Sequence, residues 1–503
     1  MSDSQGRPGG VTYREPGAEY FDKRGLKRHA RVGSLWALGV GAVISGQFSG
    51  WNLGLAVGGW GGMFVAALII SLMYLGLCFS LAELSPALPH TGGAYSFARS
   101  TLGPFGAFVT GLAESIEYIM TPAVIVFYVG TYLNAIFETP ASVAPLWWVA
   151  CYVLFSALNY VGVEVSFKVS VVVTSLALLT LAFFCVSAWP VSDFSRWALN
   201  IAADGGGSLR ELPGGGGQFL PFGLGGAFAA LPFAVWLYLG IEELPLAAEE
   251  SHAPERDMPK ALLLGMLTLL VFALSVLFFN AAIGGDRPGQ LRGAFSLATS
   301  SEPLLDGFRT LYGTSAARLL SLCAVIGLIA SFHTIIFAYS RQIYSLARAG
   351  YYPPLLSLTH GVRKTPYAAL VAGSGAGLAV LVAVWLARGP EQGGVVIGGS
   401  LLNMAVFGAM ISYTFQGVSF IVLRVKQPQL PRPYRSPLGI PGALLTIVIA
   451  LWTMTYQLRD PAYVQGVYGA LVWYTLGIAY YLLIGRHRLV LSPEEQAALA
   501  TER

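Results

Sequence analysis

Charged side chains are scarce in this chain of 503 residues. They make up 11% of the sequence, whereas hydrophobic residues make up 55%. Soluble domains carry about 25% charged residues. A chain this apolar cannot cover its surface in water, so membrane lipid is its expected surrounding. The formal net charge of +4 is also small, which gives no reason to expect nucleic acid as a partner.

Cysteine and long polar segments are scarce as well. The four cysteines, Cys78, Cys151, Cys185 and Cys323, all fall in apolar runs, so small buried side chains are favoured over a disulfide framework. A cleavable signal peptide is not expected, because the first thirty residues are polar and the first apolar run is too long for a signal core. No loop is long enough for a soluble catalytic domain.

Twelve apolar segments are long enough to cross a bilayer, which takes about 20 residues of helix. They are 34–57, 60–86, 104–136, 144–162, 166–189, 223–246, 259–284, 314–347, 366–387, 394–424, 440–457 and 464–485. The sequence therefore predicts an all-α integral membrane protein with 12 transmembrane helices. An even number of spans places both termini on the same side of the membrane.

Lys and Arg gather on the side that holds the termini. They precede span one, follow spans eight and ten, and follow span twelve, at Lys23, Arg24, Lys27, Arg28, Arg31, Arg341, Arg348, Arg363, Lys364, Arg424, Lys426, Arg432, Arg435, Arg486 and Arg488. Cytoplasmic loops carry the excess of Lys and Arg. The N-terminal segment 1–32 and the C-terminal tail 487–503 are therefore predicted to be cytoplasmic, in the plasma (inner) membrane.

Glycines and polar side chains interrupt two of the predicted spans near their middle. Span one contains ISGQFSGWN (Ile44–Asn52), and span six contains LPFAVWLYLGIEELPLAAEE (Leu231–Glu250), with Gly240 before two glutamates. Unwound backbone at this depth is tolerated only where protein or a water-filled cavity covers it. Matching breaks in two halves of a chain point to a binding site.

The five-span separation of the breaks predicts two repeats of inverted topology. The first repeat is 33–189 and the second is 223–424, with an external loop at 190–222 and helices 11 and 12 within 425–486. Half-helix ends at the breaks expose N–H and C=O groups that bind a small polar solute, so no cofactor is expected.

Packing offers a second explanation for each feature of the breaks. Gly46 and Gly50 have the small-xxx-small spacing that also lets helices approach closely. Two carboxylates at this depth are costly, and Glu242 could instead be a structural group bonded to freed backbone N–H groups. The matching interruption in span six favours the binding site over packing alone.

Several motifs resemble the amino acid–polyamine–organocation (APC) superfamily. They are SLAELSPALPHTGGAYSFARSTLGPFGAF (Ser80–Phe108), WLYLGIEE (Trp236–Glu243), AAEESHAPERDMPKA (Ala247–Ala261) and YSRQIYSLARAGYYP (Tyr339–Pro353). This resemblance covers spans one to ten closely and spans eleven and twelve weakly. It implies a leucine-transporter-like fold with discontinuous helices 1 and 6.

Within that superfamily, the chain is most similar to the ethanolamine permease branch. This similarity lies in ISGQFSGWNLGLAVGGWGG (Ile44–Gly62), GLAESIEYIMTPAVIV (Gly111–Val126) and SFHTIIFAYSRQ (Ser331–Gln342). The branch has an acidic residue after the SG of span one, where this chain has Gln47. An amino acid or polyamine therefore stays open as the alternative substrate class.

The resemblance also shows what the first break lacks. Amino-acid carriers of the superfamily have G-[SA]-G there, and its bare N–H groups take the substrate carboxylate. This chain has Gly50-Trp51-Asn52 instead. A substrate with an ammonium and a hydroxyl group but no carboxylate fits that change.

An ammonium group needs acceptors, and span three supplies two. Glu114 and Glu117 are three residues apart and lie on one helix face. Two ionised carboxylates would repel, so one is protonated or a cation lies between them. The alternative is that one of the pair bonds to a neighbouring helix.

Aromatic side chains next to the breaks can hold an organic cation on their faces. These are Trp51, Trp236 and Tyr238, and for each of them packing is the alternative; Tyr118 follows Glu117 on span three and is a further candidate contact. In the resembling carriers an aromatic residue on span six closes the site from outside, and Trp236 is the candidate for that gate.

Coupling to an ion gradient depends on titratable groups inside the spans. His333 lies within span eight and can titrate near neutral pH, so it either relays protons or bonds to a neighbour. Lys168 lies near the start of span five, where snorkelling to the interface is favoured over replacing a sodium ion. A proton is therefore favoured over sodium as the coupling ion.

These arguments define the predicted site. The substrate-binding residues are Ser45, Gln47, Gly50, Trp51, Asn52, Glu117, Tyr118, Trp236, Tyr238 and Glu242, and the coupling or gating residues are Glu114, Trp236, Glu242 and His333. No metal ligand set is predicted.

A secondary transporter that imports a small amine by alternating access is the function these features favour. An enzyme is not expected, because the sequence has no HExxH zinc motif, no convincing nucleophile–base pair and no nucleotide-binding phosphate loop. A channel or receptor fits less well, since paired breaks suit a rocking carrier better than a pore.

Overall fold

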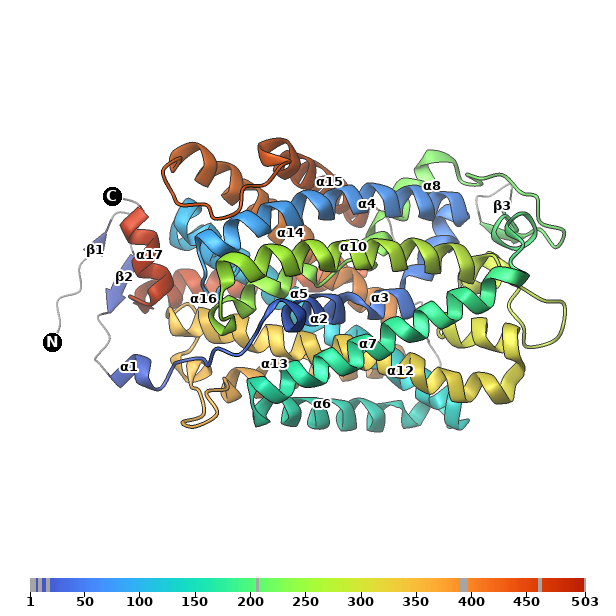
Figure 1. Cartoon of the computed structure of the whole chain (residues 1–503), viewed down its shortest axis with the longest axis horizontal. Coiled ribbons are helices and arrows are strands. Elements are labelled where there is room, and N and C mark those ends of the chain that lie inside the picture. The colour runs from blue at the N-terminus through green and yellow to red at the C-terminus, as the bar shows by residue number, and fades with distance from the viewer. Residues whose placement is uncertain are drawn as a thin grey trace.

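Long helices that run along one common direction make up most of the molecule (Figure 1). The computed structural model describes residues 6–7, 11–14, 19–204, 208–389, 397–459 and 464–501. The long helices are α2 (Val32–Val43), α4 (Gly54–Ala87), α5 (Ala94–Phe137), α6 (Ala144–Val161), α7 (Val163–Ala188), α10 (Pro254–Ala281), α12 (Pro303–Arg348), α13 (Tyr367–Arg388), α14 (Ile397–Lys426), α15 (Gly439–Arg459) and α16 (Val464–Leu483). Apart from α2, each overlaps one predicted apolar segment, but α4, α5 and α12 begin well before theirs, and residues 394–396 of predicted span ten lie outside the described residues.

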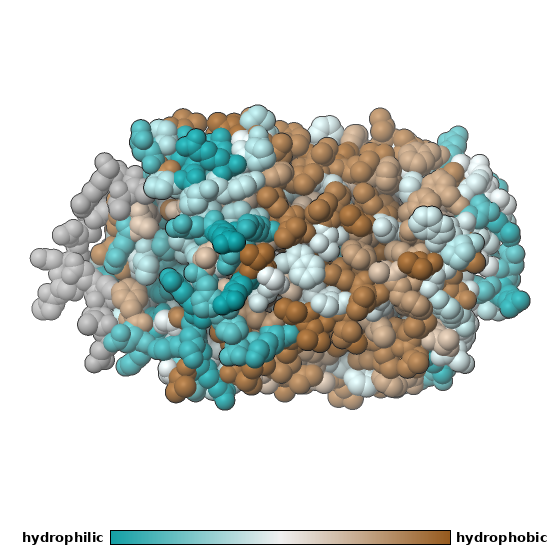
Figure 2. Space-filling view, viewed as in Figure 1, coloured by the Kyte–Doolittle hydropathy of each residue, from teal (hydrophilic) through white to brown (hydrophobic). Residues whose placement is uncertain are grey.

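On the face shown in Figure 2, apolar side chains cover the middle of the molecule, and polar side chains gather toward its two ends. Large apolar side chains of the long helices are exposed, among them Leu179 at 65%, Leu267 at 59% and Leu476 at 67%. Among the described residues, ten helices are long and apolar enough to cross a membrane. The molecule is therefore a multi-pass helical membrane protein, since such an apolar surface is stable only in lipid.

Sharp turns at glycine divide three of the long helices. They lie at Gly59 in α4, Gly103 in α5 and Gly313 in α12, where φ is +64°, +72° and +76°. The predicted spans 60–86, 104–136 and 314–347 each begin one residue after such a turn. The residues before each turn therefore lie outside the predicted span that follows the turn. In α4, residues 54–57 are instead the end of the first predicted span.

The two remaining predicted spans consist of short pieces. Span one is made of α2, α3 (Ser45–Phe48) and the 3-10 turn η1 (Trp51–Leu53), followed by the start of α4. Span six is made of α8 (Gly223–Ala229), α9 (Leu231–Val235) and the 3-10 helix η5 (Ile241–Glu250). Both predicted interruptions are thus present in the backbone.

Two small sheets depart from the all-α prediction. Near the termini, β2 (Val11–Arg14) pairs antiparallel with β1 (Gly6–Arg7) and parallel with β5 (Leu489–Val490). At the other end of the molecule, β3 (Ile201–Ala203) and β4 (Leu209–Glu211) form a hairpin within the predicted external loop (Figure 1). Strands of two to four residues are too short to show a period-two pattern, which is why the sequence did not predict them.

The remaining short elements connect the helices. They are α1 (Glu19–Asp22), η2 (Ala141–Val143), η3 (Trp189–Val191), η4 (Phe194–Ala198), α11 (Gly293–Leu297), η6 (Pro354–Ser357), η7 (Gly485–His487) and α17 (Pro493–Thr501). The described elements next to the two termini, β2 and α17, lie at the same end of the molecule (Figure 1).

Candidate functional site

The first helix break lies between α3 and η1. Ser49 is extended, and Gly50 has φ +90°, a backbone conformation that glycine adopts without strain. The N–H of Gly50 donates a hydrogen bond to Oδ1 of Asn52 at 3.1 Å. The backbone donor that a substrate carboxylate would need at Gly50 is therefore already bonded to the chain itself.

The second helix break lies between α9 and η5. Gly240 has φ +114°, and its N–H donates to both carboxylate oxygens of Glu242, at 3.2 and 3.1 Å. The Glu242 side chain thus bonds a backbone group that the break sets free, which is the structural contact that the sequence left open. Glu242 is 3% exposed.

The two breaks contact each other directly. Nε2 of Gln47 donates to the carbonyl oxygen of Leu237 at 2.9 Å, and Nε1 of Trp236 donates to the carbonyl oxygen of Ser49 at 3.0 Å. A Cβ atom at Gly46 would lie 2.1 Å from the carbonyl oxygen of Trp236. Close packing therefore explains Gly46, whereas Gly50 forms the break itself.

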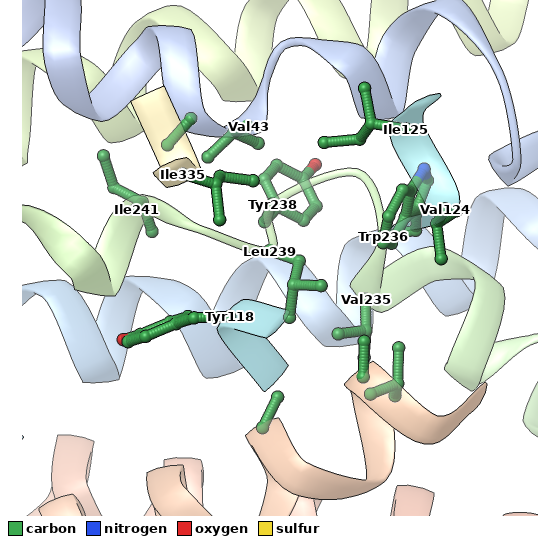
Figure 3. Packing of buried hydrophobic residues seen from close by; sticks show 14 of the residues in the cluster. Val43, Tyr118, Val124, Ile125, Val235, Trp236, Tyr238, Leu239, Ile241 and Ile335 are labelled. Carbon is green, nitrogen blue, oxygen red and sulfur yellow. The ribbon is translucent and has the colours of Figure 1, made fainter. Parts of the chain in front are cut away.

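Buried apolar and aromatic side chains surround the second break (Figure 3). The hydroxyl of Tyr238 accepts a hydrogen bond from Oγ of Ser71 at 2.8 Å, and its ring centroid lies 5.5 Å from that of Tyr74. Trp51 is fully buried, and its Nε1 has no acceptor among the described residues. Trp51 thus lies buried in the first break, and Tyr238 lies in the second break and packs against Tyr74.

Glu117 of α5 lies next to the second break. Its Oε1 accepts a hydrogen bond from the hydroxyl of Tyr413 at 3.0 Å, and that hydroxyl lies 3.0 Å from the hydroxyl of Tyr74. The carboxyl groups of Glu117 and Glu242 are neighbours, while Oε2 of Glu117 has no donor among the described residues. Two adjacent carboxylates repel when both are ionised, so this pair can hold one proton or one cation.

Glu114 and Glu243 extend this group to four buried carboxylates. The hydroxyl of Tyr118 donates to Oε1 of Glu114 at 3.3 Å. Oε2 of Glu114 and both carboxylate oxygens of Glu243 have no donor in the described part of the chain. No Lys or Arg of that part forms an ion pair with any of the four glutamates. Buried carboxylates without a counter-charge are costly within the membrane, so the cluster is suited to receive a cation.

The described residues contain no group of three or more His, Cys, Asp or Glu side chains that could hold a metal ion. The unpartnered oxygens are instead spread over two helices and lie near aromatic rings. That geometry is compatible with an extended organic cation, whose ammonium group can bond to carboxylates and pack against ring faces.

Asn52 and Ser45 have structural contacts. Nδ2 of Asn52 donates to the carbonyl oxygens of Leu297 and Ser300, at 2.8 and 2.9 Å. The backbone N–H of Ser45 donates to Oγ of Ser331 at 2.8 Å. The amide of Asn52 thus holds the first break against the end of α11 and the residues that follow it.

His333 lies apart from both breaks. Its Nδ1 is 3.2 Å from Nδ2 of Asn159 on α6, and its Nε2 is 3.1 Å from Oγ of Ser166 on α7. Both ring nitrogens therefore have partners on neighbouring helices, and these contacts favour the bonding role over the proton relay.

Sequence reasoning did not single out three residues that the fold places at the site. Tyr413 bonds to Glu117, Ser331 donates to the carbonyl oxygen of Gly41 at 2.6 Å, and Glu243 is buried with both oxygens unpartnered. Tyr and Ser are common in apolar helices, so the sequence carries no signal for the first two. Glu243 directly follows Glu242, and its position as a second carboxylate within an apolar span was the signal available in the sequence.

Comparison with known proteins agrees with this architecture. Residues 32–484 match the amino acid permease family. The chain is 29% identical to an uncharacterized transporter of Rhizobium meliloti over 85% of this chain and 86% of that protein. It is 25% identical to a branched-chain amino acid permease of Bacillus subtilis, over 92% and 94% of the two chains, and 23% identical to a methylthioribose transporter of the same organism, over 93% and 96%.

Proposed function

The chain belongs to the amino acid permease family, and we propose that it is a secondary transporter that imports a small amine, ethanolamine foremost, by alternating access. In this proposal it has 12 membrane-spanning helices, ten of them continuous and two broken, in a leucine-transporter-like fold. The inverted repeats are 33–189 and 223–424. Both termini lie in the cytoplasm, and the protein resides in the plasma (inner) membrane.

The observation that carries the proposal is the group of buried glutamates beside both breaks. Glu117 and Glu242 are neighbours, and neither forms an ion pair with a Lys or Arg of the described residues. The substrate ammonium binds between them and supplies the missing positive charge. Charge-assisted hydrogen bonds of this kind are roughly twice as strong as neutral ones. Trp236 and Tyr238 offer ring faces to the carbon chain and the cation.

The first break supports a substrate without a carboxylate. Asn52 already accepts the Gly50 N–H bond, so a carboxylate would displace a contact that the fold itself makes. Oε1 of Gln47 is buried and has no donor among the described residues. That amide oxygen accepts the hydroxyl proton of ethanolamine in the proposed complex.

Alternating access uses the contacts between the breaks. The Trp236–Ser49 and Gln47–Leu237 hydrogen bonds join the two discontinuous helices, so opening on one side of the membrane must break or shift them. Trp236 is the proposed gate. Glu114, with Glu243 close by, carries the coupling proton, because protonation of one carboxyl group removes the repulsion within this second buried pair.

Uptake into proteoliposomes tests the proposal. Labelled ethanolamine would be added with and without an inward proton gradient, against a panel of unlabelled amines and amino acids. We expect saturable uptake, faster with the gradient, that choline-like amines inhibit and neutral amino acids do not. Uptake that does not depend on the gradient would remove proton coupling while leaving the substrate assignment in place.

An amino acid or polyamine is the second candidate substrate class. It is favoured by the branched-chain amino acid permease among the relatives, which is 25% identical to this chain. The same competition panel separates the two. Exchange of an amino acid or putrescine without ethanolamine uptake would replace the first assignment with the second.

A further inference from the structure

A hollow separate from the helix breaks lies near the end of the molecule that holds the termini. Its volume is about 300 Å³, and it opens between the N-terminal segment, the turn that joins α6 to α7, and the loop before α13. Its lining consists of Lys27, Arg28, His29, the turn residues 161–165, Val362 and Arg363. None of these residues takes part in the substrate site described above.

The charge of this hollow is predominantly positive. Lys27, Arg28 and Arg363 are exposed, and among the described residues none of the three forms an ion pair with a carboxylate. Glu164 is the acidic side chain of the lining, and it is paired with Lys168 at 2.7 Å. The Arg363 guanidinium lies over the ring of Tyr160, 4.8 Å from its centroid, which restricts its orientation. Three cations thus surround a space that an anion can enter.

The rest of the lining is apolar, and three of its valines are exposed. Val161, Val165 and Val362 are 45%, 37% and 80% exposed. Figure 2 shows the polar band at the end with the termini adjoining the apolar middle on the face in view. A free anion gains nothing from exposed valines, whereas a phospholipid places its phosphate among cations and its acyl chains against apolar side chains.

We propose that this hollow binds the phosphate group of an anionic phospholipid. Three chain segments far apart in the sequence meet there, so a bound headgroup would tie them together. The N-terminal segment is also fixed to the end of η5, because the N–H groups of His29 and Ala30 donate to the carbonyl oxygen of Glu250 at 2.7 and 2.9 Å. Lipid at this site therefore stabilises the arrangement of the segments that lead into both broken helices, whatever the transported substrate is.

Native mass spectrometry of the full chain in detergent tests the lipid site. Phosphatidylglycerol would be titrated onto the wild type and onto the variant Lys27→Gln/Arg28→Gln/Arg363→Gln. We expect binding to the variant to be weaker by about tenfold or more, because each Lys or Arg near the membrane surface adds to the attraction for anionic lipid. The matched control is Arg256→Gln/Lys260→Gln/Arg435→Gln, which removes three exposed cations elsewhere and should bind like the wild type.

Two further binding measurements show whether the bound phosphate group belongs to a lipid or to a free anion. Phosphatidylcholine, which carries no net charge, should bind more weakly than phosphatidylglycerol, and inorganic phosphate should neither compete for the site nor raise the apparent melting temperature. Equal loss of binding in both triple variants would overturn the proposal, as would equal binding of the two lipids. Competition by inorganic phosphate would reassign the hollow to a free anion.

Discussion

Single side chains decide what the central site can hold. Glu117 and Glu164 are both glutamates at apolar helices, but Glu117 is fully buried with one unpartnered oxygen, whereas Glu164 is exposed and paired with Lys168. Burial strengthens every electrostatic interaction that a carboxylate makes. The two residues carry the same carboxyl group, but only Glu117 has a buried oxygen that is free to bind a cation.

Replacing Glu117 with Gln should lower amine uptake by about tenfold or more. The change removes a charged acceptor, and a hydrogen bond to a charged group contributes about 1.5–3 kcal/mol. Uptake of labelled ethanolamine into proteoliposomes measures the effect, with Glu164→Gln as the exposed control that should transport normally. Wild-type uptake by Glu117→Gln would remove this residue from the substrate site.

Trp236→Phe should reduce transport more than its effect on stability explains. It removes the hydrogen bond to the Ser49 carbonyl and keeps most of the ring, at a cost of about 1 kcal/mol. Trp473→Phe is the matched control, because Nε1 of Trp473 donates to the carbonyl oxygen of Leu112 at 3.0 Å, away from the breaks. We expect the two variants to have similar melting temperatures. Only the Trp236 variant should show slow uptake. Equal uptake by the two variants would contradict the gate assignment.

The broken helices act as a pair at the scale of elements. α3 and the segment between α9 and η5 are joined by side-chain bonds to backbone carbonyls and by direct backbone packing at Gly46. Because each break satisfies part of the other's polar backbone, neither could be solvated by lipid alone. The pair therefore forms one unit, although its halves lie about 190 residues apart.

Gly46→Ala should prevent the two breaks from packing. Its Cβ would lie 2.1 Å from the Trp236 carbonyl oxygen, which is a backbone atom that cannot rotate away, and overpacking of this kind costs about 1–3 kcal/mol or more. Gly375→Ala in α13 is the control, since nothing lies within 4 Å of its Cβ position. Size-exclusion chromatography and the apparent melting temperature measure the outcome. A Gly46→Ala protein as stable as Gly375→Ala would contradict the close contact.

Charged side chains connect the chain termini to the helical bundle at the scale of the whole molecule. Glu494 of α17 pairs with Arg348 at the end of α12, and Glu495 pairs with Arg99 at 2.6 Å. The hydroxyl of Tyr13 on β2 also donates to Glu495 at 2.9 Å. All of these groups are buried, so removing one partner would leave an uncompensated charge.

Acid should release the C-terminal helix from the bundle. Burial alone raises the pKa of Glu494, but the positive charge of Arg348 and its hydrogen bond to the carboxylate outweigh burial and lower the pKa to about 2. A carboxyl group with a depressed pKa stabilises the fold above its ordinary value near 4.5, and this contribution is lost as the pH falls toward 2. A shift of this size corresponds to about 3 kcal/mol.

Melting temperatures between pH 7 and pH 3 measure this contribution. Glu494→Gln should melt lower than the wild type at pH 7, and the difference should shrink as the pH falls below about 4.5. Glu164→Gln is again the control, because its ion pair is exposed and contributes little. A constant difference across the pH range would show that Glu494 acts through packing and not through its charge.

The sequence by itself determined the positions of the helices and the two breaks. Apolar runs of about 20 residues cross a bilayer whatever their neighbours are, and Gly50 and Gly240 interrupt them through a backbone conformation that is local. Only the tertiary structure decided that Glu117 meets Glu242 and Tyr413, that Asn52 bonds to the Gly50 N–H, and that His333 bonds to α6 and α7. Those contacts depend on how helices far apart in the sequence are rotated and packed, and composition and spacing along one helix carry no information about that.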